Sequence, residues 1–139
     1  MEDPFDLRRF VTAQESVYSQ VCEELMRGRK QTHWMWFIFP QLKGLGQSSM
    51  AVKYGIQSVE EASAYLDHPI LGSRLRECTE LVNKIEGESV DVIFGHPDDL
   101  KFHSSMTLFL RASGDDQPFA KAIAKYFGGE LDQASLDLL

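Results

Sequence analysis

The sequence has 139 residues, of which 43% are hydrophobic and 25% are charged, and its formal net charge is −7. A chain of this length suits one domain, which buries roughly two-thirds of its unfolded surface and needs no cross-link to support its core. The acidic balance excludes general binding to DNA or RNA, whose phosphates would be repelled. We therefore expect a single domain over residues 1–139.

Cysteine content and hydropathy indicate the cellular setting. Cys22 and Cys78 are too few for a disulfide framework, and both fall at positions with an apolar, helical pattern, so we expect buried free thiols. The longest apolar run, residues 34–39, is too short to cross a membrane. No signal-peptide pattern occurs at the N-terminus. We expect a cytoplasmic protein without a membrane partner.

The first half of the chain predicts one long helix and one short one. Apolar residues at spacings of three, four and seven predict an amphipathic helix over residues 6–27, which Gly28 ends. Residues 33–39 are apolar on every side, so their period fits a buried helix or a buried strand; we expect a helix because most of the chain is helical. Residues 41–57 are rich in glycine and serine, which predicts a loop.

The second half predicts further helices. Ser58 and Glu61 have the spacing of a capping box, which predicts a helix start. Pro69 suits the first turn of another helix, which we expect to end near Ile85. Residues 89–94 form a short apolar piece of either kind. Helices are also predicted over residues 97–112, 117–127 and, as a last short turn, 132–139. The whole pattern predicts an all-α fold (mainly α), a single compact orthogonal domain of about six helices.

A stretch without acidic residues suggests a binding site. Between Glu24 and Glu60 the chain has no Asp or Glu, although it contains 21 of them in total. Cations bind phosphate, tryptophan can stack on a flat ring, and a Gly-x-Gly loop can offer backbone N–H groups. These features predict a small anionic, nucleotide-like ligand. The predicted binding residues are Arg29, Lys30, His33, Trp34, Trp36, Gly44, Gly46 and Ser48. If residues 29–37 are helical, Arg29, His33 and Trp36 share one face.

An alternative interpretation of this stretch stays open. The aromatic residues can be ordinary core, and the cations can be solvated turn residues. The loop has neither the Walker A lysine nor the third glycine of a dinucleotide fingerprint, so its sequence alone is a weak signal.

The helix predicted over residues 97–112 carries a second group of polar residues. Asp98, Lys101 and Ser105 lie on one edge of its apolar stripe, and the other edge has Asp99, His103 and Thr107. Either edge could provide a general base and a polar orienting group. Alternatively, the acids of the first turn only favour the helix dipole, and the serines are small packing residues. The predicted catalytic residues are Asp98, Asp99, Lys101 and His103, and Ser104 and Ser105 are predicted to contact the ligand.

No metal or cofactor is predicted. The four histidines, His33, His68, His96 and His103, lack the spacing of metal ligands, and the cysteines are isolated in the sequence.

Three motifs carry a resemblance to a known family. They run from Arg29-Lys30 through His33-Trp-Met-Trp to Ser48, from Ala64 to Leu75, and from Phe94 to Phe109. The chain resembles a bacterial family of small proteins of unknown function, some of which are mislabelled "calpastatin". That label is rejected because such inhibitors are disordered and poor in aromatic residues, which make up 11% of this chain. The resemblance implies an all-helical, cytoplasmic protein. A fainter similarity is to the NAD- and ADP-ribose-associated superfamily, which includes hydrolases of N-glycosidic bonds.

Three functions are compatible with these features. The first is an enzyme that binds a nucleotide- or ADP-ribose-like compound and hydrolyses its glycosidic bond without a metal. The second is a non-catalytic module that binds a phosphorylated metabolite in the same place. The third is a protein-interaction domain that exposes part of the aromatic stretch.

Overall fold

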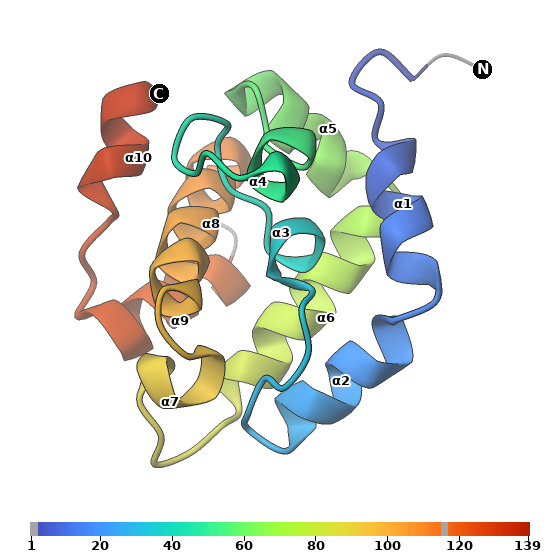
Figure 1. Ribbon diagram of the computed structural model, residues 1–139. Coiled ribbons are helices and arrows are strands. Elements are labelled where there is room, and N and C mark those ends of the chain that lie inside the picture. Colours follow the sequence, from blue (N-terminus) through green and yellow to red (C-terminus); the bar gives the residue numbers. More distant parts are fainter. Residues whose placement is uncertain (1–2, 115–116) are drawn as a thin grey trace.

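The structure is a computed structural model that describes residues 3–114 and 117–139 (Figure 1). Within these residues it contains ten helices and no strand, which confirms the all-α prediction. A single bridge pairs Leu42 with Ile56. The helices are α1 (Arg8–Glu15), α2 (Tyr18–Met26), α3 (Met35–Ile38), α4 (Ser49–Lys53), α5 (Val59–Asp67), α6 (Leu71–Asn83), α7 (Val90–Phe94), α8 (Asp98–Ser113), α9 (Gln117–Phe127) and α10 (Gln133–Leu138).

The short helix α3 lies in the middle of the molecule. It packs against α1, α6 and α8, and Figure 1 shows it enclosed by these longer helices. Trp34, which precedes it, and three of its four residues are buried. Pro40 follows the C-cap residue Phe39 and cannot donate to a continuing helix, so α3 stays short. The prediction of a short buried helix within residues 33–39 is confirmed.

The prediction of one helix over residues 6–27 is wrong. The chain turns at Ser16 and Val17, which separate α1 from α2. The break lets α1 pack against α3 while α2 packs against α6. It is held by Gln14, whose buried amide donates to Phe37 O and to Tyr65 Oη at 2.7 and 3.1 Å. Periodicity did not reveal the break because both halves keep an apolar stripe.

The segment 41–57 is only partly a loop. It contains α4, which begins where Ser48 Oγ accepts a hydrogen bond from Ala51 N at 3.1 Å. Short helices such as α4, α7 and α10 account for much of the difference between about six predicted helices and the ten that residues 3–114 and 117–139 contain.

The capping box at α5 is confirmed in part. Ser58 Oγ accepts from Glu61 N, as expected, but the Glu61 carboxylate accepts from Gln57 N and pairs with Arg9 at 2.9 Å. Arg9 also donates to the carbonyls of Lys53 and Gly55. This arginine therefore ties α1 to the chain between α4 and α5.

An aromatic cluster fixes the start of α8 beside the tryptophan segment. The ring of Phe39 meets Phe94 and Phe102 edge-on, with centroids 5.8 and 5.0 Å apart, and Phe94 stacks on Phe102 at 4.6 Å. Such pairs each add about 0.5–1.5 kcal/mol beyond the area that they bury. Because these residues come from the end of α3, from α7 and from α8, the first turns of α8 are held next to residues 34–41. Among the described residues, none of the helices is long and apolar enough to span a bilayer.

Candidate ligand-binding site

One buried carboxylate shapes the segment that leads into α3. Glu24 Oε1 accepts hydrogen bonds from Gln31 N at 2.6 Å, Thr32 N at 3.0 Å and Trp34 Nε1 at 3.0 Å. Its Oε2 accepts from Thr32 Oγ1 at 2.6 Å and from Gln20 Nε2 at 3.1 Å. Glu24, the last acidic residue before the acid-free stretch, thus fixes the path of residues 31–34. Trp34 is 1% exposed, and its Nε1–H donates to Glu24, so its ring is part of the core.

These hydrogen bonds make stability depend on pH. Burial disfavours the charged form of Glu24, but the donors from Thr32, Gln31 and Trp34 outweigh it and lower the pKa from 4.5 to about 2. The group should therefore contribute about 3 kcal/mol to the free energy of unfolding above pH 4.5, and lose it as the pH falls from 4.5 toward 2. Urea titrations at several pH values check this. A free energy of unfolding that is flat over that range would contradict it.

Two lysines and one aspartate join the tryptophan segment to α8. Lys30 Nζ lies 2.9 Å from Asp98 Oδ2, and Lys101 Nζ lies 3.5 Å from Asp98 Oδ1. The ammonium of Lys30 is 5.3 Å from the Trp34 ring centroid, and that of Lys101 is 5.3 Å from the Trp36 ring centroid. Lys30 is fixed further by its backbone N–H, which donates to Ile93 O at 2.7 Å. With one carboxylate between two ammonium groups, the cluster carries a net positive charge.

Beside this cluster, a small cavity lies between α3, α8 and the segment 41–55. Its volume is about 10 Å³, which is room for one water molecule. It is lined by Met35, Trp36, Phe39, Gln41, Ala51, Tyr54, Gly55 and Lys101. The Nε1–H of Trp36 is buried and has no hydrogen-bond partner among the described residues. The indole of Trp36 is only half-buried as a whole, so its ring reaches the surface next to Lys101.

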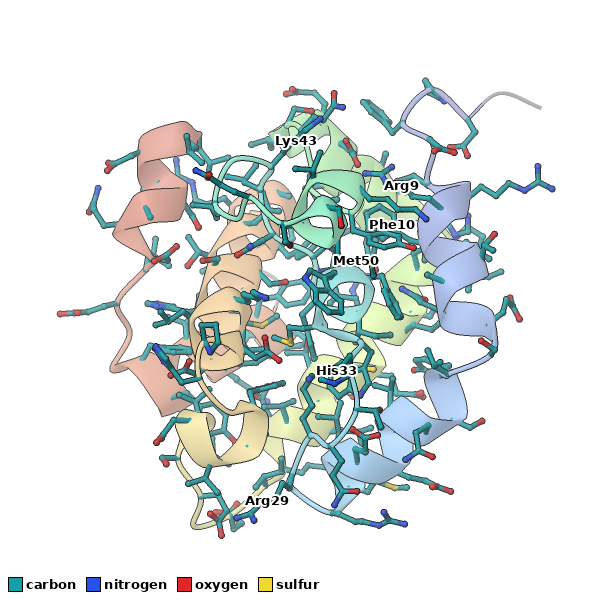
Figure 2. The ribbon with its side chains drawn as sticks, viewed as in Figure 1. Arg9, Phe10, Arg29, His33, Lys43 and Met50 are labelled. Atoms are coloured by element: carbon teal, nitrogen blue, oxygen red, sulfur yellow. The ribbon has the colours of Figure 1, made fainter. Side chains whose placement is uncertain are left out.

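Other predicted ligand contacts from the acid-free stretch do not converge. Arg29 lies at the lower end of the view in Figure 2, between α7 and α2, whereas His33 lies in the middle. Arg29 and His33 are exposed. The helix that would have aligned them with Trp36 begins only at Met35, so that premise is wrong.

The glycine loop is used for packing. A side chain at Gly46 would stand 2.8 Å from Ala51 Cβ and 3.3 Å from Gln41 Nε2, and one at Gly44 would touch Leu138 of α10. Ser48 caps α4. A close fit of the chain therefore accounts for these three residues, and a ligand role for them stays a prediction.

The polar groups on the other edge of α8 hold the C-terminal part of the chain. Ser104 Oγ donates to Asp132 Oδ2 at 2.8 Å, and Thr107 Oγ1 accepts from Asp132 N at 2.9 Å. The ring of His103 stacks on Phe127 at 3.9 Å, and its Nε2 lies 2.7 Å from Glu130 O. The density of polar residues on this helix is thus largely structural.

Two further α8 residues were predicted site residues. Asp99 pairs with His96 at 3.0 Å, away from Asp98. Ser105 is fully buried, and its hydroxyl has no partner within the part of the chain that the structure describes. Sequence reasoning missed Gln41 and Tyr54, because a glutamine in a turn and an isolated tyrosine give no pattern.

A larger hollow lies elsewhere. Its volume is about 320 Å³, it sits between α6 and α9, and it contains none of the predicted site residues. Its lining is Glu80, Asn83, Lys84, Gln117, Pro118 and Lys121. Without an aromatic or a consistent charge, this lining does not match an anion that bears a ring. Within residues 3–114 and 117–139, no group of three or more metal-ligating side chains is found.

Comparisons with known proteins agree with this fold. Residues 4–139 match the family model described as "Protein of unknown function (DUF1810)". The structure is also similar to the crystal structure of the conserved hypothetical protein Rv1873 from Mycobacterium tuberculosis, with a TM-score of 0.97 and 60% sequence identity. That match covers 99% of this chain and 98% of the other. No curated protein matches the chain. The resemblance to a family of unknown function is confirmed, whereas the likeness to ADP-ribose-associated proteins stays a prediction.

Proposed function

The chain belongs to the DUF1810 family of proteins of unknown function, and from that premise we propose that it binds a small phosphorylated, nucleotide- or ADP-ribose-like ligand at Trp36 and Lys101. The observation that supports this best is the pairing of the Lys101 ammonium with the half-buried indole of Trp36, 5.3 Å from the ring centroid, where α8 meets the acid-free stretch. A flat ring packs against Trp36, and a phosphate meets Lys101.

The ion cluster favours Lys101 as the phosphate contact. Lys30 is closer to Asp98 than Lys101 is, at 2.9 against 3.5 Å, and its side chain is only 7% exposed. Lys30 thus offsets the charge of Asp98, and the more accessible ammonium of Lys101 keeps donors for a ligand.

The cavity limits how the ligand binds. At about 10 Å³ it admits no ring, so the ligand lies at its mouth, over Trp36 and the neighbouring chain of residues 41–55. A bound polar atom that reached inward could accept from Trp36 Nε1, the donor that has no partner among the described residues.

Binding without turnover fits the acidic residues better than hydrolysis does. Both oxygens of Asp98 face ammonium groups, and Asp99 is paired with His96. A general base needs a free oxygen within reach of the attacking water. Hydrolysis of a glycosidic bond by Asp98 therefore requires its ion pairs to open when the ligand binds, whereas Asp99 uses only Oδ1 for His96.

A change of Lys101 to Met is expected to weaken binding by roughly tenfold or more, because a hydrogen bond to a charged group contributes about 1.5–3 kcal/mol. The aliphatic part of the side chain is kept, so packing against Trp36 should persist. The measurement is isothermal titration calorimetry with ADP-ribose, NAD, ADP and AMP, supported by the rise in melting temperature with ligand concentration. Lys121→Met, at an exposed lysine of α9, is the matched control.

Two results would end the proposal. One is the absence of any heat or thermal shift with all four compounds at millimolar concentration. The other is equal affinity of the Lys101 and Lys121 variants. Release of nicotinamide or ribose by the wild type, and not by Asp98→Asn, would replace binding by hydrolysis as the function.

A further inference from the structure

The fold brings the two cysteines together, although they are far apart in the sequence. Cys22 lies on α2 and Cys78 on α6, and these helices run side by side (Figure 1). Cys22 Sγ lies 3.9 Å from Glu77, the residue that precedes Cys78, each thiol shifts the pKa of the other, and neither is part of a disulfide. Cys78 is completely buried, whereas Cys22 is only half-buried. Of the pair, one sulfur can thus be reached by a small molecule from solvent and the other only by its neighbour.

The groups around Cys22 come from both helices. Tyr18, one turn earlier on α2, donates to Glu77 Oε1, and Cys22 Sγ lies 3.9 Å from the same oxygen. The guanidinium of Arg74 lies 4.7 Å from the Tyr18 ring centroid. As a thiol, Cys22 can donate to Glu77, and as a thiolate it can accept from Cys78 and Tyr18.

These contacts shift the pKa values of the two thiols in opposite directions. The hydrogen bond from Cys78 lowers the pKa of Cys22 to about 7, with help from Tyr18 and against burial and Glu77. The same hydrogen bond, together with burial, raises the pKa of Cys78. The thiolate is the nucleophile in thiol chemistry, so Cys22 reacts first. Cys78 stays protonated until Cys22 has been oxidised.

We propose that Cys22 and Cys78 form a peroxide-reactive dithiol, in which Cys22 is the attacking and Cys78 the resolving cysteine. The Cys22 thiolate attacks one oxygen of a hydroperoxide; the O–O bond breaks, the alkoxide leaves and takes a proton, and Cys22 becomes a sulfenic acid. Cys78 then attacks that sulfur, the S–O bond breaks, and hydroxide leaves as water with the thiol proton. One hydroperoxide is reduced, and two thiols are oxidised to one disulfide.

The positions of the helices suit the second step. A disulfide needs the two Cβ atoms within about 4.5 Å, which demands that the helices already lie in contact. That condition on the helices is met, because α2 packs against α6 and Cys22 Sγ touches Glu77, the chain neighbour of Cys78. The product is a cross-link between the N-terminal helices and α6, independent of the site at Trp36.

The test is to treat the reduced protein with hydrogen peroxide and measure its intact mass. The expected product is a monomer that has lost two hydrogen atoms, with a peptide containing Cys22 linked to one containing Cys78, and with its mass restored by a reductant. In Cys78→Ser, a 1,3-diketone that traps sulfenic acids should label Cys22. In Cys22→Ser, labelling should be absent, and circular dichroism shows whether both variants are folded.

A pH profile tests the role of Cys78 separately. Alkylation of Cys22 by iodoacetamide in the wild type should reach half its maximal rate near pH 7. In Cys78→Ala, which removes the hydrogen bond, the midpoint should move to higher pH. The proposal is overturned if peroxide produces no intramolecular disulfide, if the diketone labels both variants equally, or if the midpoint of alkylation is unchanged by Cys78→Ala.

Discussion

Replacing Glu24 by Gln is expected to lower the free energy of unfolding by about 3 kcal/mol. This matches the lowering of the Glu24 pKa from 4.5 to about 2, since one pKa unit corresponds to about 1.4 kcal/mol. A glutamine has one acceptor oxygen in place of two, and its amide nitrogen would face the Gln20 amide or the donors on the other side. Leaving such buried donors unpaired costs about 1–3 kcal/mol each.

Glu23→Gln is the matched control, because it makes the same chemical change one residue away. Glu23 is 54% exposed, and its ion pair with Arg27 is long at 3.9 Å. Loss of its charge should therefore change the free energy of unfolding by less than about 0.5 kcal/mol. Urea denaturation followed by circular dichroism measures both variants, and tryptophan emission reports whether Trp34 becomes wetter. Equal stability of the two variants would mean that the Glu24 network does not hold the segment 27–34.

The acid-free stretch illustrates what a sequence can and cannot reveal here. Its composition drew attention to a segment whose Lys30 meets Lys101 of α8 around Asp98, and α8 was itself predicted as a polar helix, while a ligand role for these residues stays a prediction. The partner of Trp34, however, is Glu24, the acid that marks the edge of the stretch. Such a long-range hydrogen bond leaves no periodic trace, so Trp34 and Trp36 looked alike although one is core and the other reaches the surface.

The helices show a similar division. Residues 98–113 and 117–127 were predicted within one residue, because Pro97, Pro118 and paired glycines mark their ends. The break at Ser16 was missed because it serves a tertiary contact, the amide of Gln14 against Phe37 O. The polar residues of α8 were predicted to provide a general base and ligand contacts, and three of them, His103, Ser104 and Thr107, contact Asp132 or Glu130, whose position depends on the path of the whole chain.

Gly72→Ala should be the second strongly destabilising change, even though alanine is the better helix former. A Cβ at this position would lie 2.1 Å from the carbonyl oxygen of Leu66 and 2.9 Å from its carbon. Leu66 belongs to the last turn of α5 and Gly72 to the first turn of α6, so the two helices approach with no room for a methyl group. Both neighbours are backbone atoms, which cannot rotate away.

The helices must therefore shift apart, and overpacking of this kind costs about 3 kcal/mol, more than the roughly 1 kcal/mol that alanine gains in helix propensity. The melting temperature should fall by several degrees. Ser73→Ala, at the exposed neighbouring position of α6, should leave it almost unchanged. If Gly72→Ala instead melts at or above the wild-type temperature, propensity outweighs packing, and the close approach of α5 and α6 at this glycine is not what fixes their connection.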